Sequence, residues 1–237
     1  MDTSASSNEP SFIFITGGSG SGKTSFAQSL VNRLGEATAA CINLDDYLDK
    51  RVQPEARFID GIPNFDHPSM INWELLIRHI AALREGQAID SPVYDFSSWM
   101  PSGWRHIPWK PVVVIEGIHA TQRPLEVIPG LRVFIDVGPG IRYQRRLHRD
   151  MREKNYSLEM IQKTFFEMAL PNQKLFLDPT QDSAHIVIKD LEGEVYSQLA
   201  ISYILQTLNK FRPTHYENLR VCLKHHSDRL IEENIQD

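Results

Sequence analysis

Eight residues near the N-terminus have the types and spacing of a phosphate-binding loop. The segment Gly17-Gly18-Ser19-Gly20-Ser21-Gly22-Lys23-Thr24 fits the pattern G-x-x-x-x-G-K-[ST] and is followed by Ser25. Glycines let consecutive backbone N–H groups surround a phosphate, and the N-terminal end of a following helix adds positive charge. Lys23 can then reach the β- and γ-phosphates of a nucleotide, and the hydroxyl of Thr24 can hold Mg²⁺. The spacing therefore predicts a site for ATP and Mg²⁺ at residues 17–25.

The residues on either side of this loop have the pattern that such a site requires. Phe12-Ile13-Phe14-Ile15 is a short apolar run rich in strand formers, and apolar residues recur at helical spacing from Phe26 to Leu34. Gly35 then stands where a helix would end. A flexible Gly/Ser linker would not predict a strand before the loop and a helix after it. A dinucleotide-binding loop fits less well, because no glycine occupies the third position of G-x-G-x-x-G.

Further short apolar runs alternate with helical patterns along the chain. Strands are predicted at residues 41–44, 112–115, 133–135 and 186–188, and helices at residues 73–85, 139–170 and 201–208. Residues 50–68 and 89–110 contain several prolines without a clear period, so we expect a loop in the first and an irregular insertion or hairpin in the second. The alternation predicts an α/β fold of the P-loop NTPase type, with a parallel sheet flanked by helices.

Composition and charge limit the classes of function. The chain has 237 residues, of which 41% are hydrophobic, and a formal net charge of −5, whereas proteins that bind nucleic acid through its phosphates usually carry a basic excess. No apolar run approaches the roughly 18 residues that span a bilayer. The first ten residues lack the pattern of a signal peptide, and two cysteines are too few for a disulfide framework. We therefore expect a cytoplasmic protein that uses neither nucleic acid nor a membrane.

One domain is expected, with short additions at both ends. Residues 1–10 are predicted to form a flexible tail, residues 11–209 the P-loop domain, and residues 210–237 a helical C-terminal extension. Within the domain, an i, i+3, i+4, i+7 spacing places four arginines on one helical face: Arg142, Arg145, Arg146 and Arg149. Such a face is usually a solvated surface, but beside a phosphate loop we favour a lid that clamps phosphate.

Further motifs occur in the order found in one known family. Asp45-Asp46-Tyr47 resembles the D-[SD]-[FY]-Y element of uridine kinases, Asn64-Phe65-Asp66-His67-Pro68 reproduces their N-F-D-H-P motif, and Pro92-Val93-Tyr94-Asp95-Phe96 resembles P-x-Y-D-F. Val114-Ile115-Glu116-Gly117-Ile118 matches the strand end [VL]-x-E-G-I, and Arg145-Arg146-Leu147-His148-Arg149-Asp150 matches the lid helix R-R-x-x-R-D. From about residue 12 to 208, the chain resembles the uridine kinase and phosphoribulokinase family of P-loop small-molecule kinases.

The resemblance implies roles at the reacting centre. Asp45 would be the general base that takes the proton of a 5′-hydroxyl, and it would also approach the metal. Glu116 would join Thr24 around Mg²⁺, an ion that prefers oxygen ligands. Lys23 would stabilise the negative charge of the phosphoryl group during its transfer.

Other matching residues would bind the substrates. Asp66 would hold ribose hydroxyls, and Tyr94 would line the nucleoside pocket in an acceptor-side insertion at about residues 89–110. Arg146 and Arg149 would neutralise phosphoryl charge from a lid at about residues 139–170. The resemblance therefore implies ATP-dependent phosphoryl transfer to a hydroxyl, with uridine or cytidine as the first choice of acceptor and nucleoside salvage as the setting. Uridine kinases often assemble into oligomers, so a homo-oligomer is compatible with the resemblance, although no interface can be identified in the sequence.

The departures from the family pattern lie on the acceptor side and in the lid. An ungapped alignment places Trp99 where uridine kinases usually carry a histidine that reads the pyrimidine, and an indole can stack on a base but reads its edge poorly. Lys154-Asn155-Tyr156 replaces their R-G-R, and Ala184-His185 replaces a late A-D.

Two alternatives therefore stay open. One is a kinase of the same fold that acts on another metabolite, such as a sugar phosphate, nicotinamide riboside or pantothenate. The other is a nucleotide-binding regulator that phosphorylates nothing. Asp45 and Asp66 argue against the regulator, which needs no acceptor-site carboxylates.

Overall fold

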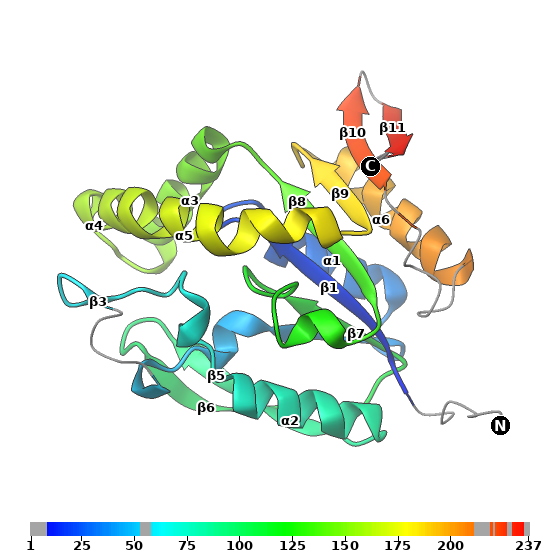
Figure 1. Cartoon of the computed structure of the whole chain (residues 1–237), viewed down its shortest axis with the longest axis horizontal. Coiled ribbons are helices and arrows are strands. Elements are labelled where there is room, and N and C mark those ends of the chain that lie inside the picture. The colour runs from blue at the N-terminus through cyan, green and yellow to red at the C-terminus, as the bar shows by residue number, and fades with distance from the viewer. Residues whose placement is uncertain (1–8, 53–57, 211–218, 220, 227–228, 235–237) are drawn as a thin grey trace.

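A sheet of mainly parallel strands forms the centre of the molecule (Figure 1). The computed structural model describes residues 9–52, 58–210, 219, 221–226 and 229–234. Within these ranges, seven strands pair in the order β11-β10-β9-β8-β1-β7-β2, and the outermost strand β11 runs antiparallel to its neighbour. The strands are β1 (Ser11–Gly17), β2 (Ala39–Asn43), β7 (Val112–Glu116), β8 (Leu131–Asp136), β9 (Ile186–Lys189), β10 (Val221–His226) and β11 (Arg229–Asn234).

Alternate side chains of the central strand β1 face opposite sides of the sheet, as in any strand. Ile13 and Ile15 join a core with α1 (Lys23–Leu34) and α6 (Glu194–Lys210). Phe12 and Phe14 join a second core that includes α2 (Trp73–Arg84). Because other elements cover both faces, the strand is apolar at every position from Phe12 to Ile15, which explains the uninterrupted run in the sequence.

Residues 44–111, between β2 and β7, form a separate group of elements on one side of the sheet. β5 (Ile89–Asp95) and β6 (Met100–Ile107) pair as an antiparallel hairpin, the second of the two forms expected for residues 89–110. The expected loop at residues 50–68 contains 3₁₀ turns at Lys50–Val52 and Pro68–Met70, and a two-residue ladder between β3 (Phe58–Ile59) and β4 (Ile62–Pro63). The hairpin and α2 lie together at the bottom of Figure 1.

A series of helices runs from β8 to β9 beside the loop that follows β1. α3 (Pro139–Glu153) comes directly after β8 and is followed by α4 (Leu158–Lys163), α5 (Leu170–Asn172) and a 3₁₀ stretch at Asp178–Ser183. Wider π-helical turns at Thr164–Ala169 and Gln173–Leu177 flank Pro171, which cannot donate an i→i−4 hydrogen bond. The helical stretch predicted at residues 139–170 is confirmed, apart from a break at residues 154–157.

The prediction of a helical C-terminal extension at residues 210–237 is wrong for residues 221–226 and 229–234, and residues 211–218, 220, 227–228 and 235–237 lie outside the described part of the chain. α6 ends at Lys210, and the described residues beyond it form β10 and β11 at one edge of the sheet. β10 pairs in parallel with β9, with Val221 opposite Ile186. Val221-Cys222-Leu223 is a short apolar run, and its burial beside β9 favours a strand. The helical period stops at the end of α6 and does not continue into these residues.

The remaining expected strands and helices are confirmed, and residues 53–57 of the expected loop lie outside the described residues. The strands predicted from the sequence correspond to β1, β2, β7, β8 and β9, and the predicted parallel α/β sheet is present. Residues 1–8, which make up most of the expected flexible tail, lie outside the described residues. Within the described ranges, no helix has the length and apolar character needed to cross a membrane.

Candidate active site

The phosphate-binding loop joins the carboxyl end of β1 to the first turn of α1, as its sequence predicts. Gly20 and Gly22 have φ angles of 82° and 92°, a backbone region that favours glycine. Gly20 also lies against α3, because a Cβ at this position would overlap the main-chain carbonyl of Arg142. Lys23 is the first residue of α1 and is 8% exposed. The loop therefore presents Lys23 at the positive end of a helix, where a phosphate is favoured.

A cavity of about 390 Å³ lies beside this loop. The loop, the first turn of α1 and one face of α3 line it with Gly20, Gly22, Lys23, Thr24, Ser25, Arg145, Arg146, Arg149 and Glu153. Four cationic side chains face one carboxylate there, which suits a polyphosphate. The other residues expected to bind ATP lie outside this lining. Gly17 approaches Ile135, Gly18 approaches Arg142, the Ser21 side chain is buried, and Ser19 lines a neighbouring cavity.

Two arginines of α3 hold the phosphate loop itself. Arg142 is 2% exposed, and it donates hydrogen bonds to the carbonyls of Val137 (2.8 Å) and Ser19 (3.3 Å). Arg145 donates a hydrogen bond of 3.2 Å to the carbonyl of Ser21. The sequence predicted the arginine face but could not separate these two residues from the rest, because helical spacing alone does not say which arginine reaches which partner.

Arg146 and Arg149 reach the cavity, as expected, and both contact one buried carboxylate. Asp150 is 1% exposed, and it accepts hydrogen bonds from Nε of Arg146 (3.2 Å) and Nε of Arg149 (2.8 Å). The ammonium of Lys154 lies 3.7 Å from the same carboxylate. Burial alone would raise the pKa of Asp150, but hydrogen bonding and charge from Arg149, with Lys154 and Arg146, hold it below its ordinary value. One ionised carboxylate therefore orients three cations.

Thr24 and Glu116, which were expected to share a metal, contact each other. Thr24 Oγ1 donates a hydrogen bond of 3.2 Å to Oε2 of Glu116, whose other oxygen Oε1 is buried without a hydrogen-bond partner. Burial, assisted by the charge of Asp45, raises the pKa of Glu116 to about 7 against the lowering effects of Lys23 and Thr24. A cation beside this oxygen would favour the ionised carboxylate.

The donor set at Glu116 fits Mg²⁺. Among the described residues, no group of three or more His, Cys, Asp or Glu side chains is arranged to hold a metal ion. Mg²⁺ is usually bound through one or two carboxylates together with substrate phosphates and water, so a site completed by ATP needs no such group.

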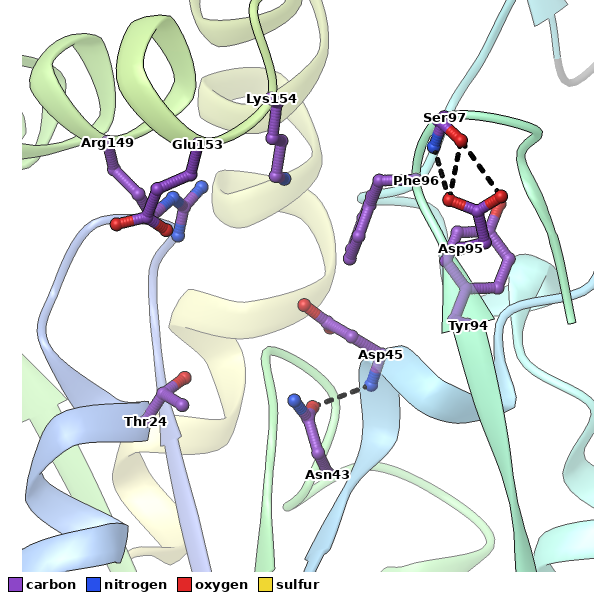
Figure 2. Close-up of a pocket in the computed structure, with 10 residues that line it drawn as sticks. All are labelled: Thr24, Asn43, Asp45, Tyr94, Asp95, Phe96, Ser97, Arg149, Glu153 and Lys154. Atoms are coloured by element: carbon purple, nitrogen blue, oxygen red, sulfur yellow. Dashed lines mark hydrogen bonds between the residues drawn. The ribbon is translucent and has the colours of Figure 1, made fainter. Parts of the chain in front are cut away.

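Asp45 lies between Thr24 of the phosphate loop and Tyr94 of the β5–β6 hairpin (Figure 2). It belongs to the 3₁₀ turn η1 (Leu44–Tyr47) that follows β2, and its N–H donates to Oδ1 of Asn43 at 2.9 Å. Two cavities share Thr24, Asp45 and Arg149: an outer one of about 480 Å³ and an inner one of about 60 Å³. A carboxylate at this junction can accept a proton from a hydroxyl placed beside the phosphate loop.

Two of the three residues expected to contact the acceptor, Asp66 and Tyr94, lie on different cavities. Asp66 is 7% exposed, lines the inner cavity and lies 3.9 Å from Arg146. Burial raises the pKa of Asp66, and the charge of Arg146 opposes this shift. Tyr94 lines the outer cavity, and its hydroxyl is buried without a hydrogen-bond partner. Both residues therefore lie close to the junction at Asp45.

Trp99 does not line any of these three cavities. Its ring packs edge-on against Phe65 with ring centroids 6.3 Å apart, and Nζ of Lys50 lies 6.0 Å from its ring centroid. Phe65 in turn contacts the rings of Tyr94 and Phe96, so the four rings form one cluster. These contacts favour a packing role for Trp99, and reading of a base by its indole stays a prediction.

The segment that replaces R-G-R joins the lid to the hairpin. Nζ of Lys154 lies 3.8 Å from the ring centroid of Phe96, and the hydroxyl of Tyr156 donates a hydrogen bond of 3.3 Å to the carbonyl of Phe96. All three residues line the inner cavity. The contact between this segment and Phe96 could not be predicted from the sequence, because Phe96 lies sixty positions before Tyr156 and no local pattern links them.

Comparison with known proteins agrees with these motifs. Residues 12–195 match the family described as "Phosphoribulokinase / Uridine kinase family". The chain is 34% identical over 184 residues to a uridine kinase of Chloroflexus aggregans, covering 75% of this chain and 86% of that one. It is 31% identical over 185 residues to a uridine kinase of Listeria monocytogenes, covering 77% and 88%.

Solved structures share the fold at lower sequence identity. A kinase attributed to a fructose transport system of Silicibacter sp. TM1040 superposes with a TM-score of 0.60 at 19% identity, covering 74% of this chain and 87% of that one. The protein YGR205w superposes with a TM-score of 0.56 at 17% identity, covering 76% and 86%. At these identities the likeness extends to the fold alone.

Proposed function

Since the chain belongs to the phosphoribulokinase/uridine kinase family, we propose that it transfers the γ-phosphoryl group of ATP to the 5′-hydroxyl of a pyrimidine nucleoside, uridine or cytidine. Membership makes the protein an ATP-dependent P-loop kinase, and the acceptor is the proposed part. The observation that best supports it is that Asp45 and Asp66, both from motifs shared with uridine kinases, line one cavity together with Arg146 and Arg149.

The proposed reaction divides into a proton transfer and a phosphoryl transfer. The acceptor oxygen would bond to the γ-phosphorus as the bond to the bridging oxygen of ADP breaks, and Asp45 would take the hydroxyl proton. Lys23, Arg146 and Arg149 would neutralise the charge of the phosphoryl group. Mg²⁺, held by Thr24 and Glu116, would supply further positive charge to the β- and γ-phosphates. Asp66 would hold the ribose, and Tyr94 would line the space for the base.

A kinase of the same fold with another hydroxylated acceptor is the second candidate. It is favoured by Trp99, which replaces the pyrimidine-reading histidine and lies away from the cavities. A regulator that phosphorylates nothing is disfavoured, because it would not require Asp45 and Asp66 to face one cavity with the lid arginines.

A product assay separates these candidates. The purified full chain would be incubated with Mg·ATP and, in turn, uridine, cytidine, adenosine, nicotinamide riboside, pantothenate and a pentose phosphate, with ADP and the phosphorylated acceptor both measured. We expect the highest kcat/KM with uridine or cytidine. Product from another acceptor alone would favour the second candidate. ATP binding without product from any acceptor would favour the regulator.

A further inference from the structure

Both strands of the hairpin formed by β5 and β6 donate hydrogen bonds to Asp46. Asp46 directly follows Asp45, the proposed general base. Its Oδ1 accepts a hydrogen bond of 3.3 Å from the backbone N–H of Tyr94 on β5, and its Oδ2 accepts one of 2.8 Å from Nη2 of Arg105 on β6. The Asp46 side chain is 13% exposed. One carboxylate thus ties the hairpin to η1.

The pairing of the hairpin explains why the N–H of Tyr94 is available. The register of β5 with β6 shifts between Val93 and Tyr94, and the residue opposite Tyr94 is Pro101. A proline has no N–H, and an irregularity of this kind interrupts regular pairing. The N–H of Tyr94 bonds to Asp46 at this point, so the link lies where the regular pairing of the hairpin is interrupted.

The same turn is fixed at its other side. Oδ1 of Asn43, at the end of β2, accepts the N–H of Asp45 at 2.9 Å. The η1 turn is therefore bonded to the sheet through Asp45 and to the hairpin through Asp46. Tyr94 and Phe96, two residues apart, both line the outer cavity beside Asp45.

We propose that Asp46 is a positioning residue that sets the placement of Asp45 relative to the acceptor wall formed by Tyr94 and Phe96. The inference rests on the proposed function, since it takes Asp45 as the base that acts on the acceptor. Loss of the Asp46 carboxylate releases both strands of the hairpin from η1 and leaves the N–H of Tyr94 without its acceptor. The phosphate loop and α3 make no bond to Asp46 among the described hydrogen bonds, so the ATP side keeps its geometry.

A second side-chain contact on the same hairpin provides a control. Nδ1 of His106 and Oδ1 of Asp90 are 2.9 Å apart and link the same two strands at their other end. These side chains are 67% and 68% exposed, and exposed pairs contribute little to stability. Removal of this pair tests whether any weakening of the hairpin has the effect expected for Asp46.

The test compares Asp46→Ala, Asp46→Asn, Arg105→Met and Asp90→Ala in the full chain. Steady-state kinetics would be measured with acceptor and ATP varied separately, ATP affinity by calorimetry and Tm by thermal denaturation. We expect Asp46→Ala to lower kcat/KM for the acceptor about tenfold or more, the effect of removing a buried hydrogen-bond acceptor, with the Kd for ATP unchanged within twofold. Asp46→Asn and Arg105→Met should each cause a smaller loss, because both keep an acceptor for the N–H of Tyr94. Asp90→Ala should leave all kinetic constants unchanged.

Three results would overturn the inference. Unchanged acceptor kinetics in Asp46→Ala would do so, whatever its Tm. An equal loss of ATP affinity would also do so, since Asp46 would then support the whole fold. If Asp46→Ala does not fold, unchanged acceptor kinetics in both Asp46→Asn and Arg105→Met would decide against it. Failure of the proposed function is recognised separately, because the unmodified protein would then phosphorylate no nucleoside, and the inference would fall with it.

Discussion

The hydroxyl of Thr24 donates a hydrogen bond to Glu116, a residue 92 positions further along the chain. The two meet because β1 and β7 are parallel neighbours, with Ile15 directly opposite Glu116. The loop after β1 and the last residue of β7 therefore share the carboxyl edge of the sheet, where open α/β folds bind their ligands. This contact joins the ATP loop to the carboxylate expected to hold Mg²⁺.

Lys23→Ala should remove most phosphoryl transfer and leave the fold intact. Lys23 lies at the start of α1, where its ammonium can stabilise the negative charge of the γ-phosphoryl group during transfer. Loss of a comparable contact lowers the rate on the order of 10³-fold or more. The measurement is kcat with the best acceptor, together with Tm. Arg33→Ala, which removes an exposed cation from the last turn of the same helix, serves as the control. Near-normal turnover in a folded Lys23→Ala protein would contradict the assigned role.

Asp45→Asn and Glu116→Gln should have different effects. Asp45→Asn should lower kcat strongly while ATP affinity stays within a few-fold, because the base acts on the acceptor. Glu116→Gln should instead raise the Mg²⁺ concentration needed for half-maximal activity, since the buried side chain that accepts the hydrogen bond of Thr24 could no longer carry a negative charge. Both effects are read from kinetics at several Mg²⁺ concentrations. Loss of Mg·ATP binding in Asp45→Asn would mean that the two roles are exchanged.

Trp99→His should lower Tm and leave acceptor preference unchanged. The indole packs on Phe65 away from the cavities, and an aromatic pair of this kind contributes about 0.5–1.5 kcal/mol beyond its buried area. The two measurements are thermal denaturation and the ratio of kcat/KM for uridine to that for the other acceptors. A selective rise in kcat/KM for uridine would show that position 99 reads the base.

His185 should make the free energy of unfolding depend on pH. Its Nδ1 accepts a hydrogen bond of 2.9 Å from the backbone N–H of Arg132, and burial, assisted by the charge of Arg132, lowers the pKa of His185 to about 4. An unfolded histidine has a pKa of about 6.5, so between these two values the unfolded state binds more protons, and stability rises with pH.

His185→Asn tests this assignment, because an asparagine can still accept the N–H of Arg132 but does not titrate. Urea denaturation at pH 5 and pH 7 should give a smaller stability difference in the variant than in the unmodified protein. Equal differences in the two proteins would assign the pH dependence to other groups.

Motifs that act locally could be predicted from the sequence. The loop at residues 17–24 and the carboxylate of Glu116 each lie at the carboxyl end of a strand whose apolar run is visible in the sequence, and parallel strands bring their carboxyl ends together. The local periodicity of apolar residues likewise predicted α1 and the five strands β1, β2, β7, β8 and β9, and the spacing of its arginines predicted α3.

Features that depend on partners far along the chain could not be predicted. β10 is a strand because its short apolar run pairs with β9. The apolar residues around it have no periodicity that would predict a strand from the sequence alone. The indole of Trp99 turns toward Phe65 through packing that an alignment does not contain. Asp46 meets Arg105 across 59 positions, and neither residue type by itself signals the link.

In the proposed reaction, the acceptor atom is the 5′-hydroxyl of a pyrimidine nucleoside. The most direct measurement compares transfer of a radiolabelled γ-phosphate from ATP to uridine and to 5′-deoxyuridine, which lacks only that hydroxyl. We predict labelled uridine 5′-monophosphate from the first and no labelled product from the second, which should instead inhibit competitively against uridine. Label on 5′-deoxyuridine, or no label on either uridine or cytidine while ATP is bound, would contradict this assignment.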